Sequence, residues 1–104
     1  MWYNYDMEKK ILYLTLNKKW FDAIASGEKK EEYRVLTNYW KIRLLDLNGT
    51  FKPFDIIRFT NGYDPKNNPT MDVECKGFGG IEKSGNMKII KIKLGNRLLA
   101  VPKV

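Results

Sequence analysis

The amino-acid sequence predicts one α+β domain spanning residues 1–104, with a mixed or antiparallel sheet that is curled or closed. Short apolar or alternating runs, separated by Gly, Asn and Pro turn signals, recur along the chain and predict five or six strands. Two segments near the N-terminus instead space their apolar residues as helices do. The length of 104 residues is sufficient for one hydrophobic core. A small sheet-rich domain with two short helices is therefore expected.

The first expected elements are a strand over Ile11–Leu16 and a helix over Lys18–Ser26. The strand segment, ILYLTL, is almost continuously apolar and rich in residues that favour strands. In the next segment apolar residues recur at helical spacing from Trp20 onward, and Asn17 can cap the helix N-terminus. Gly27 stands where a helix end needs a left-handed residue. These patterns predict a buried strand that leads directly into an amphipathic helix.

Three further elements are expected in the middle of the chain. Glu28–Val35 is expected to be a charged turn that leads into a strand. A second short helix is expected at Tyr39–Leu45 and another strand at Phe54–Thr60. Thr37 or Asn38 can cap the helix. Asn61 and Gly62 offer a tight turn after the last of these strands.

The C-terminal half predicts a succession of strands and turns. Met71–Gly77 alternates apolar and polar residues, which places Cys75 on the apolar face as a small core residue. A polar loop is expected at Asp64–Thr70, a bend or bulge at Phe78–Gly80, and a loop at Ile81–Met87. A basic strand at Lys88–Leu94, a turn at Gly95–Asn96 and a final strand at Arg97–Val101 should follow. At the N-terminus, Trp2, Tyr3 and Tyr5 fit either a disordered extension or a capping strand.

The composition excludes several kinds of site. With no histidine and one cysteine, the chain has neither an internal disulfide nor the four Cys or His ligands of a structural zinc, and no metal is expected. Nucleophile pairs that need histidine are excluded too, which leaves proton transfer to Lys, Glu, Asp, Tyr or Cys. The sequence has no recognisable signal peptide or membrane-spanning run, which predicts a cytoplasmic protein without membrane contact. The net charge of +7 favours a polyanionic partner.

The segment from Trp20 to Arg34 has the densest pattern of functional residues. Gly27, Lys29, Glu32 and Arg34 match the spacing G-x-K-x-x-E-x-R, after a helix that bears Trp20. In this pattern the chain resembles the ASCH domain family, a branch of the PUA-like fold, whose small stand-alone members occur in bacteria, archaea and bacteriophages. The resemblance extends over nearly the whole chain through three more segments, at 54–57, 61–63 and 92–95.

The resemblance implies a PUA-like β-barrel of five or six strands, curled or closed, with two short flanking helices. It also implies a cleft that holds RNA or a modified nucleoside and needs no cofactor. The residues that would line or flank this cleft are Lys29, Glu32, Arg34, Trp20, Asn61 and Tyr63.

The residues leave open whether such a domain is an enzyme. Members of the family include a ribonuclease, and one branch is similar to amidohydrolases that deacetylate 4-acetylcytidine. In a metal-independent hydrolase, Lys29 and Glu32 would share acid–base work and Arg34 would orient a phosphate or carbonyl. The amidohydrolase branch carries its threonine nucleophile where this chain has Glu32, so that mechanism does not transfer.

The same residues also fit an interpretation without a ligand. Glu32 and Arg34 share one face of a strand and can form a structural ion pair. Lys29 would then be solvated, on the other face of the strand unless the chain turns ahead of it. Trp20 and Trp40 lie on apolar helix faces, where core packing is expected.

Three lysines outside the motif are further candidate ligand contacts. Lys91 and Lys93 share one face of a basic strand, where they either contact a nucleic-acid backbone or protect the solvent face of an edge strand. Lys18, on the solvent face of the first helix, is the third candidate ligand contact. A protein-interaction module, for example a bacteriophage regulator of a host protein, is the competing function, and charge does not separate the two. The sequence does not predict an oligomeric state.

Overall fold

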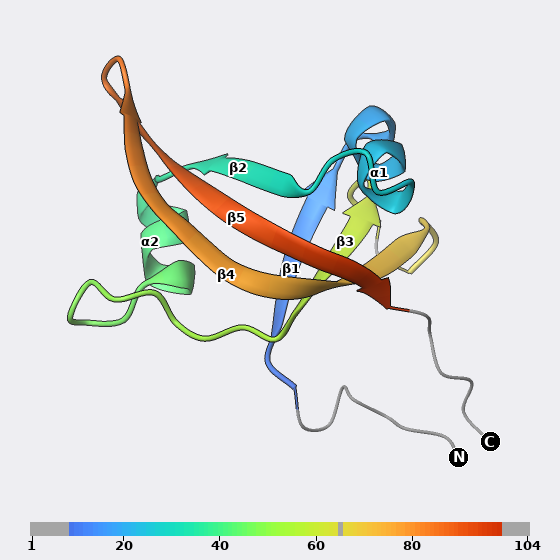
Figure 1. The fold of residues 1–104 in the computed structure, drawn as a ribbon, viewed down its shortest axis with the longest axis horizontal. Helices are drawn as coiled ribbons and strands as arrows, with labels where there is room; N and C mark the ends of the chain where they lie inside the picture. The colour runs from blue at the N-terminus through green and yellow to red at the C-terminus, as the bar shows by residue number, and fades with distance from the viewer. Residues whose placement is uncertain (1–8, 65, 99–104) are drawn as a thin grey trace.

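The computed structural model describes residues 9–64 and 66–98. Figure 1 shows a curved sheet in which two long strands, β4 and β5, run side by side, with the two helices toward opposite ends of the molecule. The elements follow the order β1 (Ile11–Leu16), α1 (Lys18–Ala25), β2 (Glu31–Val35), α2 (Asn38–Leu44), β3 (Ile56–Asn61), β4 (Thr70–Ser84) and β5 (Met87–Leu98).

These strands form one mixed sheet in the order β1-β3-β4-β5-β2. β1 runs parallel to β3, and the other neighbours are antiparallel. The α+β class and the mixed sheet expected from the sequence are confirmed. In the described part of the chain the end strands β1 and β2 do not pair with each other, so the sheet is open. The closed barrel implied by the family resemblance is therefore not confirmed.

The hydrophobic core is built from alternate residues of the strands. Leu12, Leu14 and Leu16 of β1 are buried, as are Phe59 of β3 and Ile92 of β5. Successive side chains of a strand point to opposite faces, so this alternation identifies the inner face of the sheet. Burial of such side chains contributes roughly 1.5–3 kcal/mol each to folding.

Both helices begin where their capping residues predict. Asn17 caps α1, its side chain accepting a backbone hydrogen bond at 3.1 Å, and the helix buries Phe21 and Ile24. Thr37 caps α2 in the same way, which starts the helix at Asn38. α1 contacts β1 and β3, so it holds its outer face near one end of the sheet.

The largest difference from the expected fold lies in the β4–β5 hairpin. The loop predicted at Ile81–Met87 is wrong, because the two strands run through this segment and leave only Gly85 and Asn86 in the turn. The expected bulge is present, since the pairing register shifts between Phe78 and Gly80. Gly80, with φ of +106°, allows β4 to bend there without ending.

The turn predicted at Gly95–Asn96 is also wrong, because β5 continues through it. A Cβ atom on Gly95 would lie 2.9 Å from Glu74 Cβ and 2.8 Å from Lys76 Cε. The backbone N–H of Asn96 donates to Glu74 Oε1 at 2.9 Å. This glycine therefore permits the close approach of side chains from β4, and does not mark a turn.

Two expectations concern residues that the structure does not describe. These are the aromatic residues at 2–5 and the end of the final strand at 99–101. Arg97 and Leu98 belong to β5 and do not begin a separate strand. None of the helices in the described ranges has the length and apolar character needed to cross a bilayer.

Candidate functional site

The charged residues of the sequence motif meet at the Glu32 carboxylate, on the inner face of β2. Glu32 is 5% exposed and lies opposite Ile92 of β5. Lys29 Nζ donates to Oε1 at 2.9 Å, and Arg34 donates to Oε2 from Nε at 3.1 Å and from Nη2 at 2.9 Å. The backbone N–H of Tyr33 donates to Oε1 at 3.2 Å. Both carboxylate oxygens are therefore occupied by donors.

The strand β2 turns Glu32 and Arg34 inward. The alternation of Tyr33 and Val35 predicted the strand correctly, yet these two side chains are 46% and 41% exposed and lie on the outer face. Glu32 takes the inner position because two cations and a backbone amide satisfy its carboxylate, and burial of an ion is tolerated only with such partners.

Arg34 connects β2 to the opposite end strand of the sheet. Besides its contacts with Glu32, its Nη2 donates to the backbone carbonyl of Thr15 in β1 at 2.7 Å. β1 and β2 have no backbone pairing with each other in the described sheet. The guanidinium group therefore joins the two ends of the open sheet through a side chain.

Lys29 reaches this cluster because the chain turns before β2 begins at Glu31. Its side chain is 20% exposed, so it is not the solvated lysine of the ligand-free interpretation. Lys29 Nζ also lies 4.4 Å from the centre of the Trp20 ring, and Lys19 Nζ lies 4.9 Å from it. Trp20 is 41% exposed, so the expectation that it packs in the core is wrong. The indole instead stands beside two ammonium groups.

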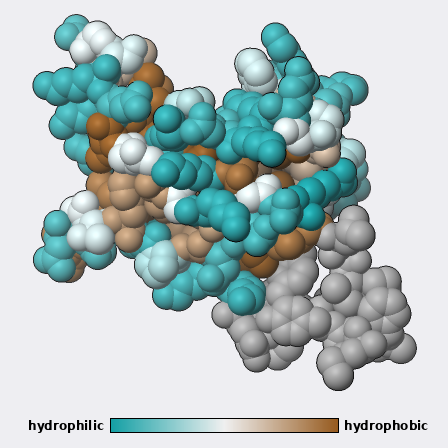
Figure 2. Space-filling model, viewed as in Figure 1, coloured by the Kyte–Doolittle hydropathy of each residue, from teal (hydrophilic) through white to brown (hydrophobic). Residues whose placement is uncertain are grey.

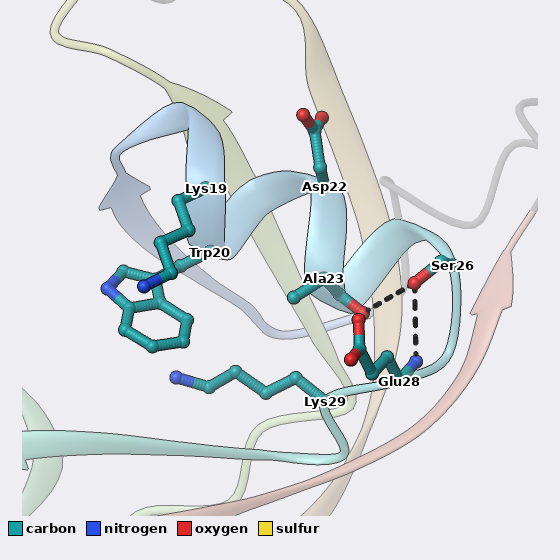
Figure 3. A pocket seen from close by; sticks show the side chains of 7 residues that line it. All are labelled: Lys19, Trp20, Asp22, Ala23, Ser26, Glu28 and Lys29. Carbon is teal, nitrogen blue, oxygen red and sulfur yellow. Dashed lines mark hydrogen bonds between the residues drawn. The ribbon is translucent and has the colours of Figure 1, made fainter.

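A groove of about 630 Å³ opens at this place, between α1 and the segment that leads into β2. Figure 3 shows the side chains of Lys19 and Lys29 extending along the Trp20 indole, while the Glu28 carboxylate turns back toward the helix. The groove is lined by Lys19, Trp20, Asp22, Ala23, Ser26, Glu28 and Lys29. It thus combines an aromatic wall with cationic and anionic groups.

Two residues beside the site, Trp40 and Lys19, are not among the predicted site residues. Trp40 of α2 is partly buried against the core, as expected, but its ring also lies 5.7 Å from Arg34 Cζ. Lys19 was not predicted because lysines on a solvent face are usually unremarkable. Its position next to Trp20 in the sequence gives no sign of the contact, because neighbours in a helix point in different directions.

Other predicted ligand contacts lie apart from the Glu32 cluster. Asn61 ends β3, and Tyr63, in the loop that follows, is 93% exposed. Lys18 is solvent-exposed and pairs with Asp22. Lys91 and Lys93 stand on the outer face of the sheet, opposite the inner face that holds Glu32. Within the described ranges, no hydrogen bond or ring contact joins any of these residues to Glu32.

The outer face beside β2 has its own small network of charges. Tyr33 Oη donates to Glu31 Oε1 at 3.0 Å, and Lys91 Nζ lies 3.5 Å from Glu31 Oε2. The hydrogen bond to Glu31, followed by partial desolvation and the Glu31 charge, raises the pKa of Tyr33. The Glu31 carboxylate, followed by Tyr33, raises the pKa of Lys91. Lys91 is therefore paired with Glu31 on the outer face.

Cys75 behaves as the core residue that the alternation of β4 predicted. It is partly buried against the core, and desolvation raises the pKa of its thiol. A raised pKa removes the thiolate that a nucleophile needs. Across the described residues, no three Cys, Asp or Glu side chains come close enough together to hold a metal ion.

Comparisons of the chain with family models, with curated proteins and with solved structures found no match. The site must therefore be interpreted from its own geometry.

Proposed function

We propose that this protein is an ASCH-like domain that binds single-stranded RNA or a nucleoside ligand at the groove beside Trp20. The observation that carries the proposal is the partly exposed indole flanked by the ammonium groups of Lys19 and Lys29. Aromatic side chains stack on nucleobases, and adjacent cations attract the phosphate backbone. The net charge of +7 supports attraction of the same class of ligand.

The Glu32 cluster supports a binding role and not a catalytic one. A general base needs a lone pair that faces the substrate, but both Glu32 oxygens accept hydrogen bonds from Lys29, Arg34 and the backbone of Tyr33. Lys29 is likewise committed to Glu32. We propose that this cluster fixes Lys29 beside the indole and thereby shapes one side of the groove.

Fluorescence anisotropy with short labelled single-stranded RNA tests the proposal. Trp20→Ala should weaken binding about five- to 150-fold, since loss of one stacked base costs about 1–3 kcal/mol. Lys19→Ala should weaken binding less, and should reduce the salt dependence, because a single-strand contact contributes about 0.7 to the slope of log K against log salt. Tyr39→Ala and Lys83→Ala, at exposed positions away from the groove, are matched controls. Equal affinity of Trp20→Ala and wild-type protein would refute the site.

An RNA cleavage assay on the same material tests the hydrolase alternative. Wild-type protein should show no cleavage above background at saturating RNA. Cleavage that disappears in Glu32→Gln and Lys29→Ala proteins would instead restore the metal-independent hydrolase as the function.

A protein-interaction role is the second candidate, because large apolar side chains are exposed far from the groove. Ile42 is 71% exposed and Leu47 is fully exposed, both on or just after α2. Figure 2 shows hydrophobic surface in the hollow between the β4–β5 turn and the α2 end of the molecule. Affinity purification with nuclease treatment separates the candidates, because a protein partner would survive that treatment and an RNA partner would not.

A further inference from the structure

We propose that the groove selects a guanine base, stacked on Trp20 and bound at its edge by the Glu28 carboxylate. This inference rests on the proposed function, since it names the base that an RNA or nucleoside ligand would place in the groove. Two features of the groove support it: one of the two cations beside the indole can move, and one carboxylate has no partner among the described residues.

The two lysines beside Trp20 differ in how firmly they are held. Lys29 donates to the buried Glu32 at 2.9 Å and is fixed. Lys19 is exposed, and within the described ranges only its contact with the indole holds its ammonium group. A cation–π contact at an exposed position is weaker than the stacking of a base on an aromatic ring. A base therefore displaces Lys19, and its freed ammonium group becomes available to a phosphate.

The free acceptor of the groove is the Glu28 carboxylate. Asp22 also lines the groove, but it is paired with Lys18. No hydrogen bond or ion pair among the described residues involves the Glu28 carboxylate, and Figure 3 shows it turned back toward α1 near Ala23, on the same side of the helix as the indole. Glu28 is exposed, and its carboxylate can accept hydrogen bonds only from a ligand edge that offers donors.

Guanine is the standard base with a suitable edge. Its Watson–Crick edge presents N1–H and the N2 amino group side by side, so a carboxylate can accept both in a bidentate contact. Adenine and cytosine place a ring-nitrogen acceptor beside their amino group, and uracil flanks its single N–H with two carbonyl oxygens. Each of these acceptors would repel one carboxylate oxygen. The combination of Trp20 and Glu28 therefore favours guanine.

The test compares seven-nucleotide uridine RNAs that differ only in the central base, which is guanine, inosine, adenine, cytosine or uracil. Fluorescence anisotropy should give about tenfold tighter binding for guanine than for adenine, cytosine or uracil, the effect expected of a hydrogen bond to a charged group. Inosine, which lacks the N2 amino group, should lose most of this preference. Glu28→Gln should lower the affinity for the guanine RNA about tenfold and leave that for the uridine RNA unchanged. Glu82→Gln, an exposed acidic position on the hairpin, is the matched control.

The outcomes separate this inference from the proposed function. Equal affinities for all central bases, together with weaker binding by Trp20→Ala, would overturn guanine selection and leave RNA binding in place. A guanine preference that persists in Glu28→Gln would overturn the assignment to Glu28. Failure of the wild-type protein to bind any of the RNAs would refute RNA binding and, with it, guanine selection from RNA.

Discussion

Replacing Glu32 with glutamine tests whether the charged cluster fastens the two ends of the sheet. The glutamine side chain keeps the shape of glutamate but offers one acceptor oxygen and one NH₂ group. In either orientation the NH₂ group faces a cation, so Lys29 or Arg34 loses its carboxylate partner, although Arg34 keeps its hydrogen bond to the Thr15 carbonyl. A partly buried cation that loses its carboxylate is costly, and a neutral residue at position 32 therefore destabilises the fold.

The magnitude follows from the exposure of the three side chains. Removing one partner of a fully buried ion pair costs about 3–5 kcal/mol, and an exposed pair contributes about 0.2–1 kcal/mol. The Glu32 side chain is 7% exposed and both cations are 20% exposed, which places the cluster between these limits. We expect Glu32→Gln to lower the free energy of unfolding by about 2–3 kcal/mol. For a domain of this size the midpoint of thermal unfolding should fall by roughly 10–20 °C.

Urea unfolding followed by circular dichroism measures this difference, with Glu31→Gln as the neighbouring control. Glu31 is 42% exposed, and its nearest cation is Lys91 at 3.5 Å, so the control should lose at most about 1 kcal/mol. If Glu32→Gln unfolded within about 0.5 kcal/mol of the control, the cluster would not hold the sheet ends and the reasoning would be wrong.

Three further outcomes are expected. Gly80→Ala should lower the urea midpoint by an amount equivalent to about 1–2 kcal/mol, because φ is +106° at this position. An added methyl group meets no atom within 4 Å, so the loss should come from backbone strain alone. An unchanged midpoint would mean that the bulge relaxes. The folded protein holds the Cys75 proton more tightly than the unfolded chain does, since burial raises the pKa of this thiol. The free energy of unfolding should therefore fall as the pH rises above the ordinary thiol range, and Cys75→Ser should abolish that part of the dependence. In ultraviolet titration Tyr33 should ionise at a higher pH than an ordinary tyrosine does, and Glu31→Gln should lower its pKa; no change would exclude the hydrogen bond as the cause.

Local patterns predicted the elements at the N-terminal end of the chain well. β1 matches its expected bounds, and α1 begins and is capped as expected, because Asn17 and the apolar spacing act within a few residues. The β4–β5 hairpin was predicted poorly. The bend or bulge expected at Phe78–Gly80 is present, but Gly95 was interpreted as part of a turn, whereas the structure uses it for close contact with side chains of the neighbouring strand. Such uses depend on the partner strand, which sequence periodicity does not contain.

The motif predicted which charged residues would meet, but not how they would be used. Lys29, Glu32 and Arg34 do come together. The contact between Arg34 and the Thr15 carbonyl joins residues on strands at opposite ends of the sheet, and no spacing rule predicts it. Trp20 was expected in the core because its helical spacing is apolar, yet two lysines stand beside its partly exposed ring. In both cases, the contact of Arg34 and the exposure of Trp20, the outcome depends on residues that are distant in the sequence or outside the periodic pattern.

The Glu32 cluster connects β1 and β2 through side chains, where a closed sheet would connect them by backbone hydrogen bonds. Arg34 donates to the β1 backbone and Glu32 accepts from the β2 backbone, so side chains satisfy main-chain groups of both end strands. A substrate that used Glu32 as a base would have to displace one of these donors and weaken the connection between the strands. Stability and catalysis would then change together in variants of the cluster. Ligand binding at Trp20 and Glu28 does not require this displacement, so their variants should change affinity while the protein remains as stable as the wild type. The separation of these two effects distinguishes a structural cluster beside a binding groove from an active site.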